Sequence, residues 1–191
     1  MFRYLVYLAI PLLALTCCPP PQMTGFVFMD IGSKYPDGST HRTELSEDFV
    51  SDATKRMISA NQTLNMDGVG EIKQKVIQDF NTGIQYVIKG GKCERMNISI
   101  EEPGCLPAIA TAVIKSFLGA GTLQIPVTMY SWKNTQVTSY LTVTDRGCVP
   151  VMYESVSVNQ GATVKITAEY FGIREGISDP SLFTVPTMCN G

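Results

Sequence analysis

The sequence predicts a single, mainly β domain, and three observations support this prediction. Residues 137–144 alternate with the period of two that strands have, with Val137, Leu141 and Val143 on one side. Short β-rich runs are separated by Gly, Pro, Asn and Asp, the residues that tight turns favour. The chain of 191 residues contains no internal repeat and no linker-like tract, so one domain with a sizeable core is expected.

The first sixteen residues have the three-part layout of a secretory signal peptide. Arg3 is followed by an apolar run from Tyr4 to Leu15, and Ala14 and Thr16 are small residues around a cleavage position. An uncleaved anchor and a lipid-modified cysteine are the alternatives. Cleavage leaves a domain of residues 17–191 with 14 basic and 17 acidic residues, because only Arg3 is lost from the 15 basic residues. We therefore expect a secreted protein without a transmembrane segment, and this charge does not favour nucleic acid.

The first half of the domain is expected to consist of strands joined by turns. Residues 26–31 are expected to form a short apolar strand, and residues 32–40 contain the Gly, Pro and Asp residues that favour a turn. Residues 47–60 form two strands around a turn at 52–55, and the polar residues 61–71 are expected to be a loop. Residues 72–100 then predict a meander of three antiparallel strands.

The second half begins with residues 106–121, which are ambiguous between a short helix and a buried strand. We expect a covered loop with one helical turn there, because Pro107 and the glycines at 119 and 121 bound the run. Three long β-rich runs follow at residues 122–132, 136–158 and 162–173.

The six cysteines predict three disulfides in an oxidising compartment. Cys17, Cys18, Cys93, Cys105, Cys148 and Cys189 contain no CxxC pair, and His41 is the only histidine, so a zinc site is disfavoured. Adjacent Cα atoms lie about 3.8 Å apart, too close for an unstrained bridge between Cys17 and Cys18, which leaves twelve of the fifteen pairings open. The sequons at Asn61 and Asn97 predict N-glycosylation, in agreement with export.

Catalytic motifs are missing from the sequence, so we expect no enzyme. His41 lies in a polar, turn-rich stretch without a nucleophile elbow, and no phosphate-binding glycine motif is complete. Scattered carboxylates could bind calcium, although no EF-hand loop is present and the metal ligands remain unknown: Asp30, Asp79, Glu101, Glu102 and Asp145. Nine methionines permit an adaptable apolar pocket, but for each of them core filling is the simpler interpretation.

Four stretches carry a resemblance to a known family. The chain has CCPPPQ at 17–22, DFNTGIQYVIKGGKCERMNI at 79–98, YLTVTDRGCVPV at 140–151 and DPSLFTVPTMC at 179–189. These stretches resemble the ependymin and ependymin-related proteins over nearly the whole of residues 17–191. Cys105 and the doubled N-terminal cysteine are typical of invertebrate members.

The resemblance implies a fold of two stacked, curved antiparallel sheets with a deep hydrophobic pocket between them, similar to bacterial lipoprotein carriers. It further implies a secreted or lysosomal glycoprotein, a homodimer and an association with calcium. For the disulfides it implies a Cys93–Cys189 bridge and a bridge from an N-terminal cysteine to Cys148. Cys105 then takes the remaining thiol; which neighbour takes which partner stays open, and we favour Cys17–Cys148 with Cys18–Cys105.

Two functions therefore compete. The first is a secreted protein that binds a lipid-like molecule in an apolar pocket without performing chemistry. The alternative is an extracellular or shell matrix protein with calcium-dependent association. A co-purifying lipid would favour the first function, and calcium-dependent self-association of ligand-free protein would favour the second.

Overall fold

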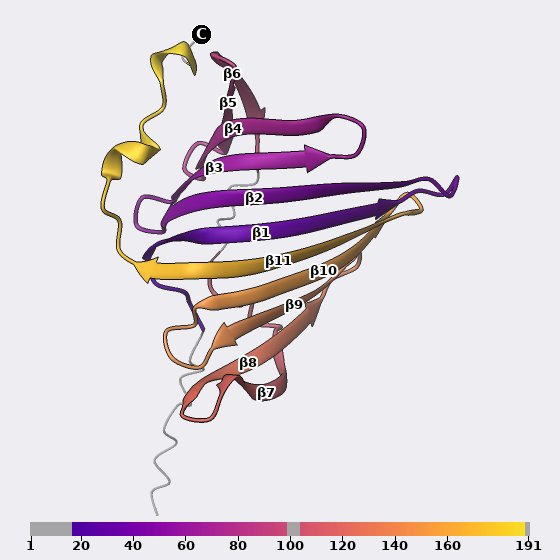
Figure 1. Cartoon of the computed structure of the whole chain (residues 1–191), viewed down its shortest axis with the longest axis vertical. Helices are drawn as coiled ribbons and strands as arrows, with labels where there is room; N and C mark the ends of the chain where they lie inside the picture. The colour runs from indigo at the N-terminus through magenta and orange to yellow at the C-terminus, as the bar shows by residue number, and fades with distance from the viewer. Residues whose placement is uncertain (1–16, 99–103, 190–191) are drawn as a thin grey trace, which may run out of the picture.

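The computed structural model describes residues 17–98 and 104–189, and its described strands form one antiparallel sheet of eleven strands. The strand order is β6-β5-β4-β3-β2-β1-β11-β10-β9-β8-β7, and the strands are stacked in this order in Figure 1. Their bounds are β1 Gln22–Lys34, β2 Thr40–Asp52, β3 Met57–Met66, β4 Gly70–Asp79, β5 Ile84–Lys89, β6 Lys92–Asn97, β7 Thr111–Ala120, β8 Leu123–Lys133, β9 Val137–Thr144, β10 Pro150–Asn159 and β11 Ala162–Glu175. The prediction of a mainly β domain is confirmed.

The first and last strands join the two halves of the sheet at its centre. β1 pairs with β11 from Met23↔Glu175 to Lys34↔Thr163, and on its other side it pairs with β2. Because both edges of β1 are hydrogen-bonded, the β1–β6 half and the β7–β11 half belong to one continuous sheet. The two stacked sheets expected from the resemblance are therefore not confirmed.

The main buried cluster lies on one face of the sheet, which we call the inner face. Side chains of directly paired residues share a face, so the pairing of Val27 with Tyr170 and of Met29 with Ala168 defines it. Val27, Phe49, Ala60 and Ala168 form the buried cluster, and Met23, Met29, Tyr153, Tyr170 and Ile173 are half-buried against it. The opposite side is the outer face.

The outer face of the central strands carries charged side chains. The Arg42 guanidinium donates from Nε to Asp30 Oδ1 at 2.9 Å and from Nη2 to Asp30 Oδ2 at 3.0 Å. Arg42 also lies 3.1 Å from Glu44 Oε1. These hydrogen bonds hold the pKa of Asp30 below its usual range. This charged part of the outer face is thus suited to water, in contrast to the inner face.

The predicted turn at 52–55 is present and is organised by one buried carboxylate. Asp52 Oδ1 accepts hydrogen bonds from the backbone N–H of Thr54 at 3.0 Å and of Lys55 at 3.1 Å. Its Oδ2 accepts from Gln22 Nε2 at 2.9 Å, so the turn is tied to the start of β1. Burial alone would raise the pKa of Asp52, but these hydrogen bonds outweigh burial and lower it.

The chain after β11 runs past the turns between the strands and ends beside β6 (Figure 1). Two short 3-10 helices, η1 Pro180–Phe183 and η2 Thr187–Cys189, lie in this C-terminal segment. Phe183 is buried, with Lys55 Nζ 5.3 Å from its ring centroid, and the Cys93–Cys189 disulfide fixes the end of the segment to β6.

Two local predictions are wrong. Residues 61–66, expected to be part of a loop, are the second half of β3, whose polar side chains pair with β2 and β4. Residues 111–120, expected to be a covered loop with one helical turn, form the edge strand β7, and every residue in it is exposed. In both runs cross-strand hydrogen bonds decide the structure, and local composition does not report such partners.

The three-stranded meander is present as β4, β5 and β6, and the three later β-rich runs contain β8 to β11. The predicted signal peptide, residues 1–16, lies outside the described residues. Among the described residues, no helix is long and apolar enough to cross a membrane.

Candidate functional site

A cavity of about 620 Å³ lies against the inner face of the β7–β11 half. Its floor comes from four neighbouring strands, with Trp132 on β8, Leu141 and Val143 on β9, Tyr153 on β10 and Tyr170 on β11. Register places Tyr153 directly between Leu141 and Ala168, so these side chains share the inner face. The size and the aromatic walls fit the range of small-molecule sites in proteins.

The cavity is covered by two segments that are not part of the sheet. Pro19 belongs to the N-terminal segment (residues 17–21), and Gly104, Leu106 and Pro107 belong to the connector (residues 104–110), which leads into β7. The Leu106 N–H donates to the Cys17 carbonyl at 2.8 Å, so the two covering segments hold one another.

One disulfide attaches this cover to the sheet, and a second joins the two covering segments to one another. Cys17 is bonded to Cys148, in the turn between β9 and β10, and Cys18 is bonded to Cys105 in the connector. Cys17, Cys105 and Cys148 also line the cavity. The adjacent cysteines thus place the N-terminal segment and the connector together over the aromatic floor.

Few polar groups enter the cavity. Tyr153 and Ser139 share a hydrogen bond of 3.3 Å between their hydroxyl oxygens, and the Trp132 and Tyr153 rings pack with centroids 6.3 Å apart. The Tyr170 ring makes an edge contact with Phe49, with centroids 6.3 Å apart. Burial, with contributions from the charges of Glu47 and Tyr153, raises the pKa of Tyr170 to about 12. Tyr170 is therefore a neutral phenol at physiological pH.

Beyond Tyr170, a polar row crosses the inner face of the other half. Tyr170, Val27, Glu47, Gln62 and Gln74 are paired in succession across β11, β1, β2, β3 and β4. Gln74 Nε2 donates to Gln62 Oε1 at 2.8 Å, and Gln62 Nε2 donates to Glu47 Oε2 at 2.7 Å. Burial raises the pKa of Glu47, and the hydrogen bond from Gln62 opposes this shift.

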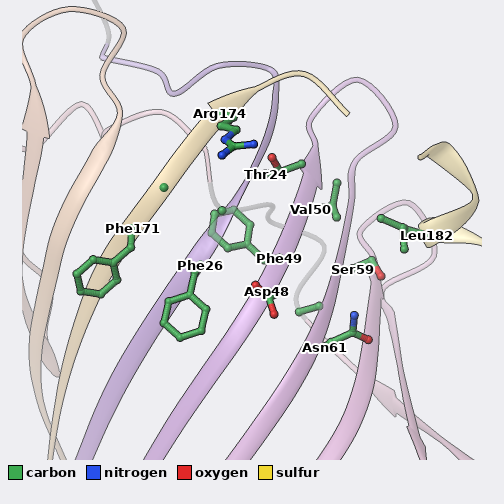
Figure 2. A pocket seen from close by; sticks show the side chains of 13 residues that line it. Thr24, Phe26, Asp48, Phe49, Val50, Ser59, Asn61, Phe171, Arg174 and Leu182 are labelled. Carbon is green, nitrogen blue, oxygen red and sulfur yellow. The ribbon is translucent and has the colours of Figure 1, made fainter. Parts of the chain in front are cut away.

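A second hollow of about 550 Å³ lies where β1 and β3 begin and β2 and β11 end (Figure 2). Phe26 and Phe171 lie beside one another there, with ring centroids 6.2 Å apart, and Leu182 of the C-terminal segment forms part of its border. Asp48 and Arg174 also line it. We favour the inner cavity as the functional site, because it is larger and lies beneath a disulfide-bonded cover.

The structure pairs the six cysteines as Cys17–Cys148, Cys18–Cys105 and Cys93–Cys189, which is the set of pairs that we favoured. The two sequon asparagines, Asn61 on β3 and Asn97 on β6, are both exposed. Asn61 lines the hollow of Figure 2.

The three described carboxylates that were considered for calcium each have a partner within the chain. Asp30 pairs with Arg42, Asp79 accepts hydrogen bonds from Asn81 and Thr82, and Asp145 accepts from the Thr128 hydroxyl. Glu101 and Glu102 lie outside the described residues. Within the described part of the chain, no group of three or more His, Cys, Asp and Glu side chains is placed to hold a metal ion. His41 is exposed, with its ring 5.6 Å from that of Tyr35.

Sequence reasoning missed the residues that form the cavity and the polar row. Trp132, Tyr153 and Tyr170 lie on three separate strands, and no local motif links them. Glu47 did have a signal, because it stands between Leu45 and Phe49 at a period of two and therefore on an apolar face. Of the methionines considered as pocket walls, Met29 packs on the inner face, whereas Met152 pairs with Glu169 on the outer face.

Comparison with known proteins identifies the family. The family model described as Ependymin matches residues 70–189, which is more than half of the chain. No curated protein gives a significant match. Among solved structures, a LolA superfamily protein from Nitrosomonas europaea is similar, with a TM-score of 0.37 and 9% sequence identity, over 87% of this chain and 92% of that one. Through the match to its family model, this chain belongs to the ependymin family.

Proposed function

We propose that this protein is a secreted, non-enzymatic binding protein that holds a hydrophobic, lipid-like molecule against the inner face of its sheet. The observation that carries this proposal is the covered cavity of about 620 Å³ with its aromatic floor. A sheet with one apolar face normally buries that face against a second layer. Among the described residues, the connector and the N-terminal segment cover the cavity, and a ligand would fill the space between them and the sheet.

Apolar burial is sufficient to drive such binding. Met23, Leu141 and Tyr153 line the cavity and are only half-buried, so a ligand would remove more of their surface from water. At about 25 cal/mol per Å², removing about 300 Å² of apolar surface contributes about 7.5 kcal/mol before the costs of association. The polar groups at the cavity then need only to orient the ligand.

Three disulfides support an extracellular setting, because such bonds persist in oxidising compartments. Secretion through the signal peptide of residues 1–16 and glycosylation at Asn61 and Asn97 belong to the same proposal. Treatment of the secreted protein with a glycosidase is expected to lower its mass in two steps, and variants with Asn61→Gln or Asn97→Gln are each expected to lose one step.

A homodimer is also part of the proposal. The edge hairpin β7–β8 exposes several large apolar side chains: Val113, Ile114, Phe117, Leu118, Leu123 and Ile125. An exposed apolar patch at an unpaired strand edge is typical of an association surface. Calcium association and a role in an extracellular or shell matrix remain separate predictions, which calcium-dependent sedimentation of the ligand-free protein would test.

The binding site is tested by placing a charge in the cover of the cavity. Leu106→Glu puts a carboxylate at the cavity, whereas Ile109→Glu puts the same group at an exposed position of the same connector that does not line it. We expect an environment-sensitive apolar dye to bind the wild-type protein and the Ile109 variant saturably. The Leu106 variant should bind it at least about tenfold more weakly, since a desolvated charge costs more than 1.4 kcal/mol.

Equal dye binding by both variants would mean that the dye does not bind beside the connector. Absence of saturable binding to the folded wild-type protein would contradict the proposed function itself.

A further inference from the structure

We propose that Glu47 is the head-group acceptor of this site and that it selects a long-chain amphiphile with a cationic ammonium head over one with a carboxylate head. The inference rests on the proposed function, because it assumes that the apolar chain of the ligand lies in the inner cavity. It adds the chemical class of the ligand and the residue that distinguishes it.

Glu47 is a carboxylate placed within an apolar surface. Its neighbours along the inner face of β2 are Leu45 and Phe49, which are 9% and 7% exposed. Its direct cross-strand neighbours are Val27 on β1 and Gln62 on β3, and neither is charged. A carboxylate in such surroundings costs free energy unless a donor or a cation compensates it.

Within the described chain, the carboxylate of Glu47 is only partly compensated by hydrogen-bond donors. Gln74 and Gln62 donate in sequence toward Glu47, so the two amides are oriented with the carboxylate as the final acceptor. Only Oε2 of Glu47 receives this hydrogen bond, and among the described residues no lysine, arginine or histidine forms an ion pair with Glu47. Oε1 is therefore open to a donor that the chain does not supply.

Tyr170 connects this carboxylate with the cavity. It is the only residue of the polar row that also lines the cavity, and it is separated from Glu47 by one strand. Its hydroxyl makes no hydrogen bond within the described part of the chain, although the residue is half-buried. A ligand whose chain lies over Trp132 and Tyr153 would thus meet an unpaired hydroxyl and then a carboxylate.

The charge of the site indicates which head group fits. An ammonium group provides three N–H donors and neutralises the carboxylate, and such charge-assisted hydrogen bonds are stronger than neutral ones. A hydroxyl head can donate but leaves the charge in place. A carboxylate head brings a second negative charge into a surface of low dielectric, where like charges repel strongly. We therefore expect affinity to fall in the order amine, alcohol, carboxylate.

The test uses the full-length secreted protein with its disulfides intact and three probes with the same sixteen-carbon chain. Hexadecylamine, hexadecanol and hexadecanoate are compared by displacement of an apolar dye at pH 7. The wild-type protein is expected to bind the amine at least about tenfold more tightly than the carboxylate, a ratio that corresponds to 1.4 kcal/mol. This ranking requires no variant and stands as a measurement by itself.

Glu47→Gln keeps the shape and the acceptor oxygen but removes the charge. We expect this variant to lose the tenfold preference, with weaker amine binding and tighter carboxylate binding. Glu169→Gln is the matched control, because Glu169 is exposed and pairs with Phe28 on the outer face. The control should keep the wild-type ranking.

The outcomes separate the two proposals. Saturable binding of all three probes without a head-group preference, or an unchanged preference in the Glu47 variant, would overturn this inference and leave the proposed function standing. If none of the three probes binds saturably, the proposed function fails.

Discussion

The two halves of the sheet use their inner faces differently. The β7–β11 half carries an aromatic floor that lies beneath two covering segments, and its edge hairpin is exposed. The β1–β6 half carries the buried cluster around Phe49 and Ala60 and the polar row, and its edge is held by the C-terminal segment. The same antiparallel sheet thus carries a covered cavity on one side of the β1–β11 pair and a buried cluster with one polar row on the other.

The largest expected effect comes from removing the disulfides of the two halves separately. The Cys18–Cys105 and Cys93–Cys189 bridges span similar sequence separations of 87 and 96 residues. The chain-entropy model assigns each a contribution of up to about 5 kcal/mol. We therefore expect C18S/C105S and C93S/C189S to lower the free energy of unfolding by similar amounts in urea titrations.

Ligand binding should separate these two variants, because, of these two bridges, Cys18–Cys105 holds the cover of the cavity and Cys93–Cys189 does not. C18S/C105S is expected to bind an apolar dye at least about tenfold more weakly, at a temperature where both variants are folded. C93S/C189S should bind it normally. Equal loss in both variants would mean that binding depends on global stability instead of on the cover.

The exposed edge of the β7–β11 half gives the next largest effect. Leu118 and Ile125 are direct cross-strand neighbours and are 40% and 54% exposed. L118K/I125K is expected to shift the proposed homodimer to monomer in sedimentation velocity, because two like charges would be brought into the interface. Val69→Lys is the control, since Val69 is an exposed apolar residue in the turn between β3 and β4. A dimer that persists in the double variant would place the interface elsewhere.

The smallest expected effect concerns the pH dependence of the β1–β6 half. Because the pKa of Glu47 is raised in the folded state, this group stabilises the fold below its ordinary value of 4.5 and loses that contribution as the pH rises through the folded pKa. Glu47→Gln is therefore expected to be more stable than the wild type at pH 7. Near pH 4 the two proteins should unfold at similar temperatures. A variant that is less stable at pH 7 would mean that ionised Glu47 supports the fold.

Local sequence patterns predicted those parts of the fold whose residues alternate clearly or favour a turn by themselves. Val137, Leu141 and Val143 alternate cleanly and form β9, and the turn at 52–55 follows from the short polar residues around Asp52. Residues 61–66 and 111–120 were misassigned because their strand character depends on pairing with the neighbouring strands, which the composition of each run does not report. A polar strand between two others and an exposed edge strand both lack the half-buried alternation that sequence analysis detects.

The candidate site was less predictable than the fold. The family resemblance implied a hydrophobic pocket, but the floor depends on the register of β8 to β11, which brings Trp132, Leu141 and Tyr153 onto one face. The resemblance implied the Cys93–Cys189 bridge and a bridge from an N-terminal cysteine to Cys148, but it left open which of Cys17 and Cys18 takes which partner. How the Cys18–Cys105 bridge holds the connector at the cavity depends on the position of the connector in space. A non-reducing peptide map should recover these three pairs.

The most direct test of the account is the fluorescence of Trp132, the only tryptophan in the sequence and a residue of the cavity floor. Titration with a sixteen-carbon amphiphile should give a saturable blue shift at one ligand per chain, since the ligand would displace water from the indole. Native mass spectrometry of the same samples counts bound ligand independently. Binding by mass with unchanged Trp132 emission, or no saturable change at all in the folded protein, would contradict a ligand site on the inner face.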